Sequence, residues 1–286
     1  MTMPSSLWIL LLTLLTQVCA RVTNGDAELR LEFQNATARH GRILGGTAVT
    51  VNTFPLYNYH VLVKGTGASG IAETFCGGAL LTKNYVITAA HCVASGGSAS
   101  VYVGKRTDPI TGNTPFQGVP IIHPGFKYNY MANNIALVRL IKAVTISGTV
   151  GTIRLSSVHP STLNDIVVKT MGFGPADETT VLPTPPVMNV IEMTHLYGPT
   201  CKSDTIDVYV DYPPETGCLS TESGAKGVCF GDGGGPVIYP SATDNSPKLL
   251  AINSQYLACS SQYPSSITYI FPFIGWIQAT VRLVLT

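Results

Sequence analysis

The side chains best suited to chemistry in this sequence lie at His91 and around the turn 231–236. His91 follows the run T-A-A and precedes Cys92, and an imidazole can accept or donate a proton near neutral pH. The turn reads G-D-G-G-G-P, and Gly233 at its centre has no side-chain oxygen with which to attack a carbonyl. One histidine beside a cysteine is a weak signal, and a glycine-rich turn can arise by chance. The rest of the chain must therefore decide what this pair means.

Many short apolar runs separated by Gly, Pro, Asn and Ser predict the elements that would position these residues. Short strands with frequent turn signals favour an all-β barrel or sandwich. Residues 274–285 could form one C-terminal helix, because Trp276, Ile277, Val281 and Val284 lie near helical spacing. Residues 183–186 and 240–247 read as surface loops. The expected strands include 59–63, 78–81, 85–88, 101–103, 135–141, 167–172, 236–239 and 249–252.

The N-terminus resembles a secretory signal. Leu7 to Val18 is a short apolar run, and Val18-Cys19-Ala20 is a plausible cleavage site, so residues 1–20 are expected to be a signal peptide. An uncleaved anchor is the alternative, although the run is short for a bilayer span. No later stretch is long and apolar enough to be a transmembrane helix. We therefore expect a secreted, extracellular protein.

Residues 21–42 are polar and end in R-H-G-R, directly before I-L-G-G. They are either a flexible tail or a propeptide that is cut after Arg42. Asn35 begins the sequon N-A-T, so an N-glycan would be attached to this segment.

Charge and cysteine usage exclude several classes of function. The formal net charge is only +1, which gives no indication of a nucleic acid, heparin or anionic membrane as partner. Six of the seven cysteines remain once Cys19 is removed, and an even number in a secreted chain indicates disulfides. No CxxC pair or clustered His/Cys spacing points to a metal, and no motif points to a cofactor.

Ordered motifs give the chain a family resemblance. Residues 75–81 read F-C-G-G-A-L-L and residues 86–92 read V-I-T-A-A-H-C. They are followed by G-F-G at 172–174, the turn 231–236, and Trp276-Ile277 near the end. In this order the motifs resemble the chymotrypsin/trypsin-like serine protease family over residues 43–286. The resemblance implies two six-stranded antiparallel barrels with a C-terminal helix, as one peptidase-like domain after the segment 21–42.

The family's disulfide pattern selects one pairing among the many that six cysteines allow. It implies the bonds Cys76–Cys92, Cys201–Cys218 and Cys229–Cys259. Each closed loop would stabilise the fold by roughly 3 kcal/mol on the chain-entropy estimate.

The resemblance also implies that two of the three catalytic side chains are missing. His91 keeps the histidine position, Asn134 replaces the aspartate of the family's D-I-A-L motif, and Gly233 replaces the serine. An amide cannot offset the imidazolium charge and favours the wrong tautomer, at a cost on the order of 10⁴ in turnover. Loss of the nucleophile costs on the order of 10⁶. We therefore expect no peptidase activity, with His91 a residue of the barrel interface and a proton-transfer role the less favoured alternative.

The activation machinery of the family is retained. Cleavage after Arg42 would free the amino group of Ile43, which in family members pairs with the aspartate at the position of Asp232. Such a pair could order neighbouring loops, or it could be inherited without use. Gly231 and Gly233 keep the oxyanion-hole positions, with no reaction to serve.

The substrate cleft departs further from the family. Gly227 is expected at the base of the primary pocket, where no carboxylate would select Lys or Arg. The family's S-W-G strand aligns with residues 253–255, and the pocket wall aligns with Gln255 and Ser265. Gln255 is long enough to fill the pocket, which counts against a decoy that holds substrate as an active enzyme does.

Three classes of function remain. The favoured one is a non-catalytic homolog that binds an extracellular protease, zymogen or inhibitor and so regulates a proteolytic or defence cascade. The second is a binder of a glycan, a microbial surface or a heterologous enzyme. The third is residual serine endopeptidase activity, which would be the label assigned by fold alone.

Overall fold

A computed structural model describes residues 43–65, 74–174, 187–198, 201, 213–255, 259 and 263–282. The expected signal peptide, the segment 21–42 with Asn35 and Arg42, and the loop 183–186 lie outside these residues.

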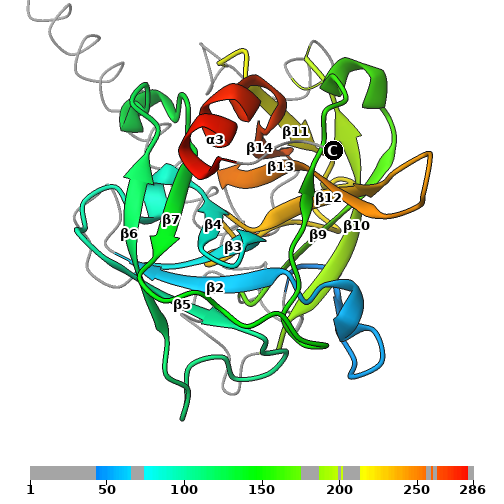
Figure 1. Cartoon of the computed structure of the whole chain (residues 1–286). Helices are drawn as coiled ribbons and strands as arrows, with labels where there is room; N and C mark the ends of the chain where they lie inside the picture. The colour runs from blue at the N-terminus through cyan, green and yellow to red at the C-terminus, as the bar shows by residue number, and fades with distance from the viewer. Residues whose placement is uncertain are drawn as a thin grey trace, which may run out of the picture. The chain divides into compact units, whose positions relative to one another are not determined.

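The first half of the described chain forms a closed antiparallel barrel (Figure 1). Its strands follow one another around the barrel in the order β2-β3-β4-β7-β6-β5. Five of its six strands have buried apolar residues in the core, which includes Val61, Leu80 and Leu137, and half-buried residues of β6 pack against the same cluster. The strands are β2 (His60–Gly65), β3 (Thr74–Thr82), β4 (Tyr85–Thr88), β5 (Ala99–Val103), β6 (Phe116–Ile122) and β7 (Ala136–Leu140).

The second half forms another barrel, which confirms the predicted fold class. The strands run β10-β11-β14-β13-β12-β9, and pairing of β9 with β10 closes the ring. Two short strands, β1 (Thr47–Ala48) and β8 (Arg154–Leu155), pair with β10 and β13 respectively. The six barrel strands are β9 (Val167–Gly172), β10 (Asn189–Leu196), β11 (Thr216–Leu219), β12 (Pro236–Pro240), β13 (Pro247–Gln255) and β14 (Ser265–Tyr269).

Helical structure among the described residues is short. The predicted C-terminal helix is present as α3 (Ile274–Val281), with Ile277 fully buried and Trp276 and Val281 packed against the core of the first barrel. It ends where Arg282 takes a left-handed conformation, and Val284 lies outside the described residues. The 3-10 turns are η1 (Phe54–Leu56), η2 (Ala90–Cys92), η3 (Tyr128–Tyr130), η4 (Pro160–Leu163) and η6 (Phe271–Phe273).

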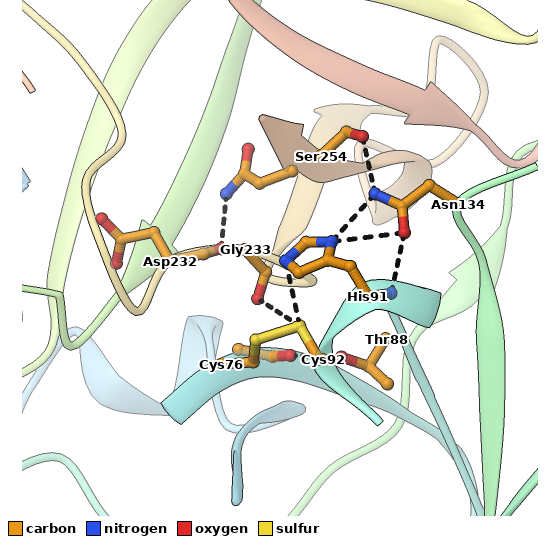
Figure 2. The surroundings of a disulfide bond; sticks show 10 residues. Cys76, Thr88, His91, Cys92, Asn134, Asp232, Gly233 and Ser254 are labelled. Atoms are coloured by element: carbon orange, nitrogen blue, oxygen red, sulfur yellow. Dashed lines mark hydrogen bonds between the residues drawn. A yellow bond between two sulfur atoms is a disulfide. The ribbon is translucent and has the colours of Figure 1, made fainter. Parts of the chain in front are cut away.

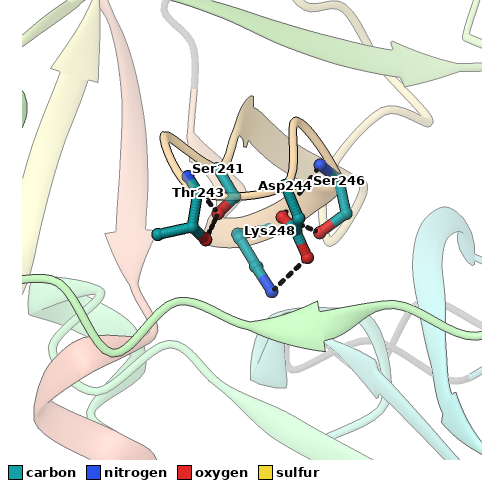
Figure 3. A network of polar contacts seen from close by, with 5 residues as sticks. All are labelled: Ser241, Thr243, Asp244, Ser246 and Lys248. Atoms are coloured by element: carbon teal, nitrogen blue, oxygen red, sulfur yellow. Dashed lines mark hydrogen bonds and ion pairs between the residues drawn. The ribbon is translucent and has the colours of Figure 1, made fainter.

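The loop predicted at 240–247 is the turn between β12 and β13 (Figure 3). The carboxylate of Asp244 accepts hydrogen bonds from the hydroxyl and the backbone N–H of Ser246 at 2.7 and 3.1 Å. These bonds lower the pKa of Asp244 to about 2. The Lys248 ammonium is 4.0 Å away and adds a weak ion pair at this exposed position. The network stabilises a surface turn at the far end of the hairpin.

Two of the three expected disulfides are present, Cys76–Cys92 and Cys201–Cys218. The third expectation is not met, because Cys229 and Cys259 are buried side chains that are not bonded to each other. They are nevertheless in contact, and a hydrogen bond to Cys259 contributes to raising the pKa of the Cys229 thiol. Family pairing therefore identified the right neighbours, but proximity alone does not oxidise two thiols. Within the described part of the chain, no helix is long and apolar enough to cross a bilayer.

Candidate functional site

The backbone of His91 is held at the junction of the barrels by its neighbours in the sequence. It lies in the 3-10 turn η2, which follows β4 and whose neighbours Ala90 and Cys92 are fully buried. The disulfide from Cys92 to Cys76 ties this turn to β3, as Figure 2 shows. The small residues Ala89 and Ala90 allow the turn to lie close against the barrel. The sequence run A-A-H-C thus fixes the histidine backbone.

Asn134 faces His91 across this junction, as the sequence predicts. Its Oδ1 atom accepts the backbone N–H of His91 at 3.0 Å, and this contact orients the amide. The Nδ2 atom then donates to Oγ of Ser254 at 2.8 Å and to Nδ1 of His91 at 2.9 Å (Figure 2). The amide therefore presents an N–H group where a triad aspartate would present a carboxylate.

This arrangement sets the tautomer of His91. Nδ1 of His91 lies 2.9 Å from Nδ2 and 3.2 Å from Oδ1 of Asn134. Since Oδ1 already accepts the backbone N–H of His91 and the contact with Nδ2 is the shorter, Nδ1 accepts from the amide and the proton of the neutral ring is on Nε2. The Nε2–H group points to Sγ of Cys92 at 3.4 Å. Burial lowers the pKa of His91 to about 4, and the carbonyl oxygen of the Asn134 amide, 3.2 Å from Nδ1, opposes this shift only in part. At neutral pH the ring is uncharged and has no lone pair on Nε2 to act as a base.

Gly233 lies on the other side of the imidazole. A Cβ atom built on this glycine would be 2.9 Å from Nε2 and 3.2 Å from Cε1 of His91. Real Cβ atoms do not approach other atoms so closely, so the ring occupies the space that a side chain at position 233 would need. The carbonyl of Gly233 accepts the N–H of Gly77 at 2.8 Å and joins the two barrels at this point.

The glycines that follow are required by close packing. Gly234 has a φ of +77°, and a side chain there would collide with the hydroxyl of Thr88. Gly235 faces Gly77, whose own Cβ would come within 2.6 Å of the Gly235 Cα atom. The turn 231–236 is thus a tight element that lies against β3, and its glycine content has a structural cause.

Asp232 points away from His91 into the second barrel. Its carboxylate is fully buried and accepts the backbone N–H groups of Gly174 and Cys229, each at 2.9 Å. Desolvation raises the pKa of this carboxyl to about 7, and the two hydrogen bonds oppose the rise. A buried acid of this kind is suited to receive a cation.

The residues after the expected activation site are docked on the same barrel. Ile43 is fully buried in its core with a φ of +44°, which is strained for a β-branched residue. Leu44 forms a bridge with Gly227, and its carbonyl accepts the Gly227 N–H at 3.2 Å. The start of the peptidase-like domain is therefore integrated with the region that carries Asp232.

The expected pocket positions are only partly described. At Gly227, a side chain would collide with the backbone carbonyl of Cys259, so this glycine accommodates a neighbouring chain segment. Ser265 is buried in β14 opposite Leu219. Gln255 ends β13, but its side chain lies outside the described part. The expected obstruction by Gln255 thus stays a prediction.

Sequence reasoning missed two residues that support the site. Ser254, and not Asn253, is the residue of β13 that reaches Asn134, whereas Nδ2 of Asn253 donates to Oγ1 of Thr170. Glu215 is buried and its carboxylate accepts the backbone N–H of Asn133 at 2.5 Å. Asn133 has a φ of +51°, so this bond holds the bend that presents Asn134. No motif surrounds Glu215, and only its position in space reveals its role.

A cluster of possible metal donors is present but is not available as thiolates. The donor atoms of Cys76, His91 and Cys92 lie within 4.8 Å of one another. Both sulfurs are joined in a disulfide, so neither can bind a metal as a thiolate while that bond is intact.

Comparisons with known proteins agree with this geometry. The family model for trypsin matches residues 43–277. Brachyurin from Leptuca pugilator is 29% identical over 208 residues, which are 71% of this chain and 86% of that protein. Trypsin from Sus scrofa is 28% identical over 248 residues, 84% of this chain and 96% of that protein.

A solved structure titled HL collagenase shares the fold, with a TM-score of 0.70 at 23% identity, covering 85% of this chain and all of that one. The match to the trypsin model spans most of the sequence and includes both barrels. This chain therefore belongs to the trypsin-like serine protease family.

Proposed function

We propose that this protein is a secreted, non-catalytic member of its family that acts by binding a protein partner in an extracellular proteolytic or defence cascade. The observation that carries the proposal is the contact between His91 and Gly233. The imidazole lies where the side chain of a nucleophile would have to be, and no oxygen is present at that position.

The chemistry of the remaining groups supports the same conclusion. Acyl transfer in this family needs a hydroxyl, a base that can take its proton, and an acid that holds the base. Here the ring carries its proton on Nε2, because Asn134 donates to Nδ1. Two separate defects thus affect the same site, and each alone would cost several orders of magnitude in rate.

The binding role is supported by what the fold retains. The segment that begins at Ile43 is docked, Asp232 is buried, and the tight turn 231–236 keeps its contacts with β3. A scaffold of this kind presents fixed surface loops without chemistry, as expected for a partner of a protease, zymogen or inhibitor. The two disulfides support passage through an oxidising compartment.

The first experiment tests catalysis. Protein cut after Arg42 is incubated with peptide and ester substrates and with a serine-directed phosphonate, beside an active trypsin as control. We expect no turnover and no covalent label. Stoichiometric labelling of any serine would contradict the proposal.

The second experiment tests binding. Affinity capture from the native extracellular fluid, with the cut and uncut chains as baits, should retain a protease, zymogen or inhibitor in stoichiometric amount. Retention of a glycan-bearing surface without any such protein would instead favour the alternative class of binder.

A further inference from the structure

The two barrels are joined by direct backbone contact near the altered site. The N–H of Gly77 on β3 donates to the carbonyl of Gly233 at 2.8 Å. A Cβ atom on Gly77 would be 2.6 Å from the Cα atom of Gly235. This junction has no side chains of its own, so the residues beside it determine whether it stays closed.

His91 flanks the junction from one side. Its Nε2 atom is 2.9 Å from the Cβ position of Gly233, and its Nδ1 atom accepts a hydrogen bond from Asn134. A second proton on this ring would have to be placed on Nδ1. There it would face the N–H₂ group of Asn134 at 2.9 Å and, at 3.2 Å, an amide oxygen that already accepts the backbone N–H of His91. The amide could turn over only by giving up the bonds to Ser254 and to the backbone N–H of His91.

His60 flanks the junction from the other side. It is 2% exposed, and its Nε2 atom is 3.3 Å from the Cβ position of Gly77. Both ring nitrogens lack a hydrogen-bond partner within the described part of the chain. The ring packs edge-on against Phe173, with centroids 5.4 Å apart. An imidazolium here would be a buried charge with no acceptor, which is costly in a protein interior.

The groups around these two rings offer little to balance a positive charge. His60 is paired in the sheet with Ala79 and contacts Phe173, while His91 contacts Asn134 and the Cys76–Cys92 disulfide. The buried carboxyls of this region are Glu215, which accepts the backbone N–H of Asn133, and Asp232, which is bound to two backbone N–H groups. The pKa of Asp232 is raised to about 7, so it also loses its charge as the pH falls.

We propose that His60 and His91 form an acid-sensitive latch, in which the two uncharged rings keep the Gly77–Gly233 junction closed and protonation of either ring opens it. The substitution of the family's aspartate by Asn134 creates the second half of the latch. An aspartate would accept a proton-bearing Nδ1 and balance its charge, whereas the uncharged amide offers only an oxygen that is already bonded to the His91 backbone and cannot balance the charge.

The direction of the effect follows from linkage. Burial lowers the pKa of His60 to about 3 and that of His91 to about 4, from an ordinary 6.5. The open state therefore binds protons more tightly, and closure weakens as the pH falls below 6.5. Protonation can shift the opening equilibrium by at most about 300-fold through His91 and about 3000-fold through His60. These limits follow from the difference between the ordinary and the lowered pKa of each ring. Protonation of Asp232 has the opposite effect, because its pKa is raised in the folded protein. Matched variants of the site are therefore needed to measure the histidine contributions separately.

The test is hydrogen exchange at the Gly77 amide, expressed as protection relative to the intrinsic rate, at pH 6.5 and 4.5. Wild-type protection should fall by about 40- to 50-fold for each ring that opens with this linkage. Asn134→Asp should remove the His91 part, because the carboxylate accepts Nδ1–H and balances the charge. His60→Phe should remove the His60 part, and His159→Gln, at an exposed histidine, should change nothing.

A second readout keeps the proposal testable if a variant folds poorly. In the wild-type protein, the ring signals of His60 and His91 in NMR spectra should show neither ring titrating near pH 6.5. The proposal is overturned if either ring titrates at its ordinary value in the folded protein. It is also overturned if the acid-induced loss of protection at Gly77 is the same in both variants as in the wild type.

Discussion

The Nε2 atom of His91 lies 2.9 Å from the position that a Cβ atom would take on Gly233. In this family the nucleophile and the base must be separated by enough space for a hydroxyl and its hydrogen bond. Here the imidazole lies closer to that position than a Cβ atom tolerates. Any side chain at position 233, a serine included, therefore requires a shift of the His91 ring.

This contact predicts how much folding stability is lost when a side chain is introduced at position 233. Gly233→Ala should destabilise the protein by about 1–3 kcal/mol, because the new methyl group forces the ring of His91 to move. Adding His91→Ala should recover most of that loss. Gly97→Ala is the matched control, since a Cβ atom there would meet nothing within 4 Å. Urea unfolding of the wild type, Gly233→Ala, His91→Ala, the double variant and Gly97→Ala measures the coupling, and additive effects at positions 233 and 91 would contradict the contact.

The same contact predicts weak rescue of catalysis. Gly233→Ser with Asn134→Asp should restore little turnover of an apolar chromogenic peptide, because the ring must move and the pocket positions remain altered. Adding Gln255→Gly and Ser265→Gly should then give a strongly non-additive gain, as expected for groups that act together. Turnover near that of an ordinary family member from the double variant alone would show that the cleft is open.

Strand prediction from the sequence succeeded where hydrophobic runs are continuous. The predicted bounds of 85–88 and 167–172 equal those of β4 and β9. Other barrel strands, β6 and β14 among them, lack such a run. β6 contains Gly118 and Pro120, which disfavour a strand locally, and β14 contains Ser265, Ser266 and Thr268, which are buried only because β11 and β13 pair on both sides of it. Tertiary pairing determines these elements.

The candidate site could be located from motifs, but its geometry could not. The motifs placed His91, Asn134 and Gly233 together, because family spacing carries that information. They did not reveal the direction of the Asn134 amide, which depends on Ser254 and on the backbone N–H of His91. They also did not identify His60, since a buried histidine without partners has no sequence signature.

The buried pair Cys229 and Cys259 makes a chemical prediction. Burial and the contact with Cys259 raise the pKa of the Cys229 thiol well above its ordinary value, so it is protonated and unreactive in the folded state. Iodoacetamide at pH 8 should leave Cys229 unlabelled in the native protein and should label it after denaturation without reductant. Peptide mass mapping measures this. Absence of label after denaturation would show that the two cysteines are joined in a disulfide.

The last prediction concerns cleavage after Arg42 and its dependence on pH. Asp232 has a pKa raised from 3.8 to about 7, so the folded, uncut chain binds this proton more tightly than the unfolded chain does. The stabilisation is complete below pH 3.8 and is lost as the pH rises through 7, which amounts to roughly 4 kcal/mol for a shift of this size. If the new ammonium of Ile43 reaches the carboxylate, the ion pair stabilises the charged form of Asp232 and offsets this loss of stability at high pH.

Cutting should therefore raise the Tm by several degrees at pH 7.5 and much less at pH 5, where the carboxyl is already protonated. Calorimetry of the cut and uncut forms at both pH values measures this difference. The Arg42→Gln chain, treated with the same protease, controls for cleavage elsewhere. Asp232→Asn should abolish the pH dependence of the difference, because no carboxylate is left to receive the ammonium. An equal rise at both pH values would mean that cleavage acts by relieving the strained φ of Ile43 and not through Asp232.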